Sequence, residues 1–332
     1  MSSTTLSSWS QSEVPADWSI EALETARQLA TSIDTAAVTI VHRGQPVYQW
    51  GDVTARYKCH SIRKSLLSAL IGIYVDEGRI DLDATLADLG IDDREGLTER
   101  ERAATVMDLL TARSGIYHPT HYETPRMVRI KPARHSFGPG TWWCYNNWDF
   151  NALGTIFEQL VGESLFDVFR DRIASPLGME DYRYDDTRRD GEYVHSEASM
   201  HAAYPFRLSA RDLARFGVLF LNGGRWNGTQ VVPEKWVRMS VRPYSLAGDR
   251  GGYGYMWWVA NQDIHFPQMS VPHGTYSARG ARGHYVVVVP ERELVVVHRV
   301  DTDIPGRKVS ATDFGALLER ILNAQRLDTA VA

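Results

Sequence analysis

The stretch Ser61-Ile-Arg-Lys64-Ser-Leu-Leu-Ser-Ala-Leu-Ile-Gly-Ile-Tyr-Val75 joins a short polar start to a long uncharged run. From Ser65 to Val75 no residue is charged, and the apolar residues fall on every side of a helical projection. A helix that is apolar all round is typical of a protein interior. The stretch therefore predicts a buried helix that begins near Ser61 and ends near Gly78.

Ser61 and Lys64 lie three residues apart, a spacing that places both side chains on one face of a helix. Lysine is rare here: the chain has five lysines, and arginine supplies the rest of its 36 basic residues. Arginine keeps its proton in a protein, whereas a poorly solvated lysine can lose it and act as a base toward a serine hydroxyl. The alternative is an ordinary helix start, with Ser61 as the cap and Lys64 on a solvated face.

A second polar group follows a Gly-Pro-Gly turn, in Tyr145-Asn146-Asn147. Tyr145 is a candidate for shuttling a proton between the serine, the lysine and a leaving group. The amide of Asn147 is a candidate for orienting the substrate carbonyl or the lysine. The alternative is a buried aromatic loop with a polar turn.

The remaining patterns predict strands near both ends of the chain and helices between them. Helices are expected over residues 19–33, Thr98–Ala112, Asn151–Val161, 209–221 and Ala311–Ala324. Strands are expected at Ala37–Val41, Pro46–Trp50, Tyr253–Val259, Tyr285–Val289 and Leu294–Val300. The runs Val286–Val289 and Leu294–Val297 are unbroken and apolar, which favours strands covered on both faces.

These elements predict an α/β fold of the α+β type, with an antiparallel sheet built from both termini and flanked by helices. Residues 18–78 plus 251–328 are expected to form the sheet lobe, and 79–250 an inserted, mainly helical lobe. The active site is expected in the cleft between the two lobes. Residues 1–17 are expected to be a flexible tail.

Composition narrows the possible partners. The net charge of −5 gives no indication of nucleic-acid binding, and no stretch reaches the roughly 20 apolar residues of a membrane span. Residues Met1–Glu13 lack the basic start and apolar core of a secretory signal, and two cysteines cannot form a disulfide framework, so we expect a cytoplasmic protein. His118-Pro-Thr-His121 lacks further candidate ligands nearby, so we expect no metal site and no cofactor. Nothing indicates an oligomeric state.

The motifs and their order resemble the serine β-lactamase and penicillin-recognising hydrolase superfamily, closest to its class C-like esterase and 6-aminohexanoate-dimer hydrolase branch. Ser61-Ile-Arg-Lys64 is similar to the family's S-x-x-K, and Tyr145-Asn-Asn147 to its Y-x-N. Framework stretches that agree are Leu109–Gly115, Phe137–Asn147, Pro176–Met179, Ser209–Arg215 and Tyr253–Trp258. The resemblance spans residues 35–325 and implies the β-lactamase/transpeptidase-like fold.

The family's third motif, K-T-G, has no lysine in this chain. Alignment of the following strand places Thr275-Tyr276-Ser277 there, and His273-Gly274-Thr275 is the alternative. The resemblance implies that Tyr276 contacts substrate and that the N–H groups of Ser61 and Ala278 form the oxyanion hole. Arg279 or Arg282 is a candidate for contacting a carboxylate, or else belongs to an arginine-rich surface.

The sequence thus predicts a serine hydrolase that cleaves a small-molecule ester or amide through an acyl-enzyme on Ser61, with Lys64 and Tyr145 as the other catalytic residues. The runner-up is a β-lactamase or D,D-peptidase, which the missing lysine disfavours. A catalytically silent binding or sensor domain on the same fold is the alternative of another class.

Overall fold

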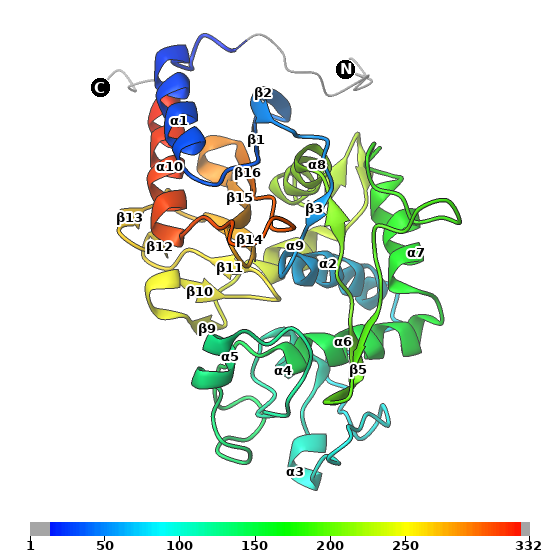
Figure 1. Cartoon of the computed structure of the whole chain (residues 1–332). Coiled ribbons are helices and arrows are strands. Elements are labelled where there is room, and N and C mark those ends of the chain that lie inside the picture. The colour runs from blue at the N-terminus through cyan, green and yellow to red at the C-terminus, as the bar shows by residue number, and fades with distance from the viewer. Residues whose placement is uncertain (1–13, 327–332) are drawn as a thin grey trace.

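The computed structural model describes residues 14–326 and contains an eight-stranded antiparallel sheet (Figure 1). Its strand order is β2-β1-β16-β15-β14-β11-β10-β9, so strands from the two ends of the chain are neighbours, as predicted. The strands are β1 (Ala37–His42), β2 (Gln45–Gly51), β9 (Ser245–Leu246), β10 (Gly252–Tyr253), β11 (Trp258–Val259), β14 (Tyr276–Gly280), β15 (His284–Val289) and β16 (Leu294–Arg299). The pairing of Ala37 with Arg299 ties the first strand to the last.

Helices cover both faces of this sheet. Val286 and Val288 of β15 pack into a core shared with α8 (Ala210–Leu221). Their neighbours Val287 and Val289 pack on the opposite side with α1 (Ile20–Ser32) and α10 (Ala311–Ala324). Alternate side chains of a strand point to opposite faces. The unbroken apolar runs therefore follow from burial on both sides, and that prediction is confirmed.

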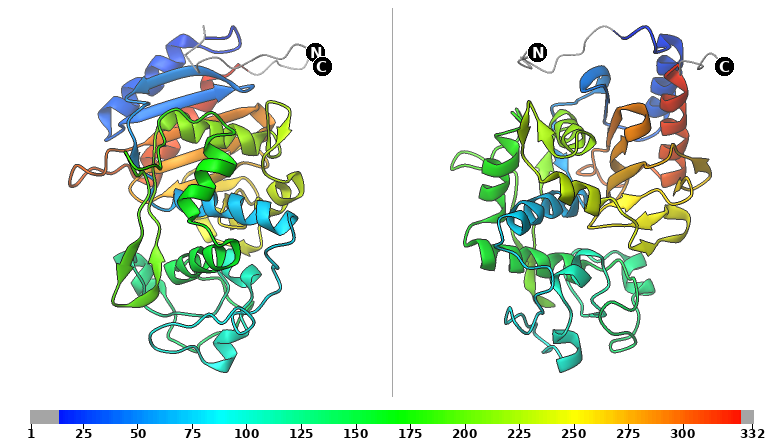
Figure 2. Two further views of the ribbon diagram at one scale, coloured as in Figure 1. Left: turned by 90° about the vertical axis from the view of Figure 1, so that its right-hand side faces the viewer. Right: turned by 180° about the vertical axis from the view of Figure 1, so that it is seen from behind.

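The predicted buried helix is α2 (Ile62–Asp76), in which every residue from Ile62 to Tyr74 is buried. It contacts β14 and β15 of the sheet and three helices: α6 (Asn147–Val161), α7 (Leu165–Phe169) and α9 (Glu234–Ser240). In both views of Figure 2 this light-blue helix lies at about mid-height of the molecule. Elements from the middle and the late parts of the chain therefore fix the position of Ser61.

Residues 79–250 contain more short strands than we expected. Besides the helices already named they form α3 (Glu99–Arg102), α4 (Val106–Leu110), α5 (Pro125–Ile130) and the π-helix η1 (Arg170–Ala174). Small antiparallel pairs join β3 (Tyr57–Lys58) to β6 (Arg207–Leu208), β4 (Val194–Ser196) to β5 (Ser199–Ala203), and β7 (Arg225–Trp226) to β8 (Thr229–Gln230). Near the sheet, β12 (Ile264–Phe266) pairs with β13 (Met269–Ser270), and η2 (Gly248–Arg250) and η3 (Pro290–Arg292) are 3₁₀ turns.

Two predicted elements are interrupted. The single helix expected over Thr98–Ala112 is wrong, because Thr98 and Thr105 each begin a separate short helix with a complete capping box. The β-rich stretch Tyr253–Val259 is not one strand, because Met256 has a φ of 59° and the chain turns back between β10 and β11.

Two predictions about the organisation of the chain stay predictions. Residues 1–13 of the expected tail lie outside the described residues, and the two-lobe boundaries stay predictions. Within residues 14–326, no helix combines the length and apolar character needed to cross a bilayer.

Candidate active site

Ser61 lies directly before the first turn of α2. Its backbone is already helical (φ −77°, ψ −4°), and its hydroxyl makes no capping hydrogen bond. The segment that leads to it is held from the far end of the chain: Arg299 Nη2 donates to the carbonyl oxygens of Tyr57 (2.8 Å) and Lys58 (3.0 Å). The interpretation of Ser61 as a simple helix cap is therefore wrong, and its Oγ is available for other partners.

Lys64 is buried one turn into α2, with 1% of its surface exposed. Its Nζ donates to Ser61 Oγ (2.7 Å) and to Tyr145 OH (2.8 Å), and lies 4.7 Å from the centroid of the Phe150 ring. Burial, together with the neighbouring charge of Arg63, holds the Lys64 pKa well below its usual value. The amine therefore becomes neutral, and able to accept a proton, at a lower pH than an exposed lysine.

Tyr145 reaches this pair from the loop before α6. The loop is fixed at both sides: the Cys144 N–H donates to Ala112 O (2.9 Å), and the Asn146 side chain caps α6 by accepting from the Trp148 N–H (2.8 Å). Burial raises the pKa of Tyr145 to about 12, although its hydrogen bond with Ser61 acts in the opposite direction. The phenol thus keeps its proton and can pass it on.

Asn147 is the first residue of α6 and 2% exposed. Its Nδ2 donates to the carbonyl oxygens of Tyr122 (2.7 Å) and His121 (3.5 Å), which fixes the direction of the amide. Its Oδ1 has no hydrogen-bond partner in the described chain. The structure therefore brings Asn147 close to the predicted site with an acceptor unused.

The predicted third-motif residues lie elsewhere. Tyr276 and Ala278 sit on the face of β14 that packs into the core beneath the sheet, 3% and 0% exposed, and Ala278 pairs with Val286 of β15. The strand reaches the serine only at its end, where a Cβ on Gly280 would lie 2.6 Å from Cys59 O. His273 is exposed in the loop before β14, where its N–H donates to Glu291.

Comparison with known proteins agrees with this geometry. The beta-lactamase family model matches residues 20–318. The chain belongs to the beta-lactamase family. Its fold is that of the serine hydrolases of this family.

Individual relatives are distant. Penicillin-binding protein 4 of Amycolatopsis lactamdurans is 30% identical over 148 residues, which cover 42% of this chain and 38% of that protein. A putative 6-aminohexanoate-dimer hydrolase from Bacillus anthracis has a TM-score of 0.68 and 24% identity, over 92% of this chain and 83% of its own. EstCE1, a hydrolase with promiscuous acyltransferase activity, has a TM-score of 0.64 and 17% identity, over 92% and 98% of the two chains. At these identities the likeness of the two structures concerns the fold.

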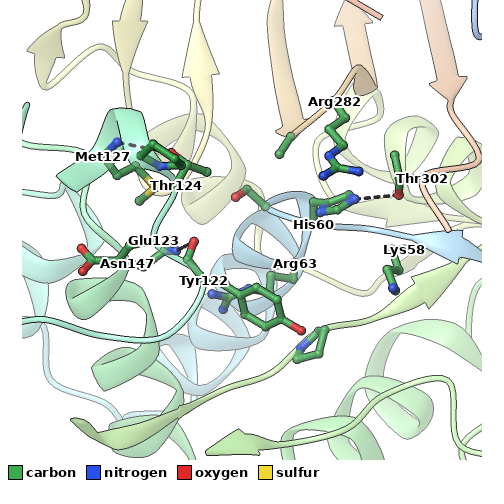
Figure 3. A pocket seen from close by; sticks show the side chains of 14 residues that line it. Lys58, His60, Arg63, Tyr122, Glu123, Thr124, Met127, Asn147, Arg282 and Thr302 are labelled. Atoms are coloured by element: carbon green, nitrogen blue, oxygen red, sulfur yellow. Dashed lines mark hydrogen bonds between the residues drawn. The ribbon is translucent and has the colours of Figure 1, made fainter. Parts of the chain in front are cut away.

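In this beta-lactamase-family chain a cavity of about 440 Å³ opens beside Ser61 (Figure 3). Its wall includes Asn147, residues at the start of α2 (His60 and Arg63), residues in the turn after β14 (Ala281 and Arg282), and Lys58 and Thr302. Burial lowers the pKa of His60 to about 4, and its Nε2 is paired with Thr302 Oγ1 (2.8 Å). His60 is thus neutral near pH 7 and contributes no charge to the cavity.

The sequence reasoning missed two groups in this wall. Ala281 was not considered, although glycines at 280 and 283 mark the place where the chain turns close to another backbone. Arg63 was overlooked because an arginine in an apolar helix is usually at the surface. Its position between Ser61 and Lys64 was the available signal.

A buried acid lies behind the Tyr145 loop. Asp149 accepts hydrogen bonds from Ser114 Oγ (2.6 Å) and Asn146 Nδ2 (2.9 Å), and it is 0% exposed. Burial raises the Asp149 pKa to about 8 against the effect of these hydrogen bonds. The Asp149 side chain therefore connects the Tyr145 loop to Ser114 through its hydrogen bonds. Because folding raises its pKa, the free energy of unfolding depends on the pH at which Asp149 is protonated.

Proposed function

We propose that this protein is a serine hydrolase that cleaves a carboxylic ester or small amide through an acyl-enzyme on Ser61. The observation that carries the proposal is the buried Lys64 amine, in hydrogen-bond contact with both Ser61 Oγ (2.7 Å) and Tyr145 OH (2.8 Å). A nucleophile, a base with a lowered pKa and a proton carrier are thereby in mutual reach.

In the first step neutral Lys64 takes the Ser61 proton while Ser61 Oγ bonds to the substrate carbonyl carbon. The oxyanion is stabilised by backbone N–H groups, for which we propose Ser61 and Ala281. Thr275 O accepts from Ala260 N–H on the β11 side of β14, so backbone groups of residues of the same parity face that edge. Ala278 has the opposite parity, so its backbone groups face β15, whereas Ala281 lies in the turn directly after β14 and lines the cavity.

Collapse of the tetrahedral intermediate breaks the bond to the leaving group, which takes a proton delivered through Tyr145. Water then attacks the acyl-enzyme and gives its proton to the same lysine–tyrosine pair, which delivers a proton to Ser61 Oγ as the bond to the acyl carbon breaks and the acid is released. We propose that Asn147, which lines the cavity, contacts the substrate, and that its unpartnered Oδ1 would accept from an amide N–H. The two cysteines are unsuited to nucleophilic attack, since burial raises the pKa of both, that of Cys144 to about 12.

The β-lactamase or D,D-peptidase alternative needs a cation where K-T-G would lie. The arginine in that stretch of β14, Arg279, instead donates to Ser277 Oγ (2.9 Å) and His265 O (2.7 Å) and stacks on Trp258 and Phe266. This arrangement favours an esterase or amidase. Free buried thiols at Cys59 and Cys144 support the further proposal of a reducing, cytoplasmic location.

The test compares wild type with Ser61→Ala on p-nitrophenyl esters, the 6-aminohexanoate dimer and a chromogenic cephalosporin. We expect turnover of an ester or amide that disappears in the variant. Absence of Ser61-dependent turnover of all three would favour the silent binding domain, and fast hydrolysis of the cephalosporin alone would favour the β-lactamase.

A further inference from the structure

Arg63 occupies an unusual place for a charged residue. It lies in the first turn of α2 between Ser61 and Lys64, lines the cavity and is 3% exposed (Figure 3). Its Nη2 donates to Asn151 Oδ1 (2.8 Å), and its guanidinium lies 4.1 Å from the centroid of the Tyr204 ring. Its Nη1 has no partner, and no carboxylate in the described chain pairs with it.

The other charges around the cavity do not compensate Arg63. Glu123, the acidic residue in the wall, forms an ion pair with Lys131, and Lys58 forms one with Asp303 (2.8 Å). Arg282 extends into the same space from the turn after β14 and has no carboxylate partner in the described residues. Two positive charges, on Arg63 and Arg282, are therefore left without an anion beside the proposed nucleophile.

A buried guanidinium with an unused donor is costly, because the group has lost water without gaining an anion. Its planar donors match the two oxygens of a carboxylate. A cavity of this volume is large enough to hold such a ligand group next to Ser61. The positive cavity would also attract anions over neutral molecules.

We propose, building on the hydrolase function above, that the substrate carries a carboxylate and that Arg63 binds it in the cavity beside Ser61, with Arg282 adding attraction at the rim. The substrate class is then an ester or amide of a dicarboxylic acid, or one whose leaving group bears a carboxylate. Arg63 is the residue that would distinguish these compounds from their neutral counterparts.

The experiment uses two matched substrate pairs. In the first pair the acyl group carries a carboxylate in mono-p-nitrophenyl glutarate and none in p-nitrophenyl pentanoate. The butyryl esters of 4-hydroxybenzoate and of its methyl ester place or omit it on the leaving group. For each pair the ratio of kcat/KM, anionic over neutral, is measured for wild type, Arg63→Gln and the matched control Arg126→Gln, which removes an exposed arginine outside the cavity wall.

We expect Arg63→Gln to lower this ratio about 10- to 100-fold in one of the two pairs, as for loss of a hydrogen bond to a charged group. Arg126→Gln should leave it unchanged, and Arg63→Lys should retain part of it. An unchanged ratio in both pairs for a folded, Ser61-dependent Arg63→Gln enzyme overturns the inference and leaves the proposed function standing. No Ser61-dependent hydrolysis of any of the four esters overturns both.

Because Arg63 is buried, its variants require a folding check by thermal melting. A measurement on wild type alone gives an independent readout: competitive inhibition by butyrate and by butyramide, which differ in charge and little in size. We expect butyrate to inhibit at least tenfold more strongly and to lose that advantage in high salt. Equal inhibition would contradict a carboxylate site.

Discussion

Replacement of Lys64 by methionine removes the proposed base while keeping a similar apolar stem. The variant loses the amine that contacts Ser61 Oγ at 2.7 Å and Tyr145 OH at 2.8 Å. General-base catalysis contributes roughly 10²- to 10⁴-fold, or about 3 to 5 kcal/mol of activation free energy. We expect kcat on a p-nitrophenyl ester to fall by this factor.

The pH dependence gives the mechanism a second test. The Lys64 pKa is held well below its usual value, so wild-type kcat/KM should rise with pH as the amine loses its proton, and Lys64→Met should lose that limb. Unfolded lysine binds a proton below about pH 10.4. The stability of wild type relative to Lys64→Met, measured in urea titrations, should therefore decrease as the pH is lowered from that value.

Lys235→Met is the matched control, because Lys235 is exposed on α9 and far from the motif residues in sequence. It should change neither kcat nor the pH profile. Hydrolysis by Lys64→Met within tenfold of wild type, with the same pH profile, would refute the assignment of Lys64 as the base.

Two further changes test the surroundings of the site. Asp149→Asn removes a carboxyl whose pKa is raised to about 8. Between about pH 4 and 8 the folded wild type holds a proton on Asp149 that the unfolded chain has released. The free energy of unfolding of wild type relative to the variant, measured in urea titrations, should therefore fall over this range by up to about 1.4 kcal/mol per pH unit. A pH-independent difference would contradict the raised pKa. Gly280→Ala places a Cβ 2.6 Å from Cys59 O and should displace the segment before Ser61, lowering kcat/KM at least tenfold in the ester assay. Gly315→Ala, whose Cβ would meet its nearest atom at 3.5 Å within α10, should keep full activity and gain up to about 1 kcal/mol. Equal activity of the two alanine variants would contradict the proposed contact.

Much of the fold was predictable because local pattern and final environment agree. The uncharged run after Lys64 is buried as the sequence indicates, and the valine runs of β15 and β16 are covered on both faces. The break between α3 and α4 was also readable, since Thr98–Glu101 and Thr105–Asp108 each have the spacing of a capping box. The apolar residues of Thr98–Ala112 recur at helical spacing across this break, which is why the sequence predicted one helix in place of two.

The wall of the site was harder to predict, because it depends on tertiary contacts that the spacing of motifs in the sequence does not reveal. Ala278 lies within β14 and pairs with β15, whereas Ala281 lies in the turn just after the strand, and motif spacing does not say where the strand ends. The burial of Arg63 depends on Tyr204 and Asn151, which lie far from it in sequence. Only the tertiary structure brings these groups together.

The hydrogen bonds from Arg299 to the chain just before Ser61 have a consequence for biosynthesis. During translation the serine segment leaves the ribosome long before β16, the strand that carries Arg299 and pairs with β1. Contacts between such distant parts of a chain form slowly, because a long loop must close first. A nascent or truncated chain that lacks β16 would have the complete Ser61, Lys64 and Tyr145 set without a fixed nucleophile. The proposed hydrolase activity should therefore appear only after the last strand has docked.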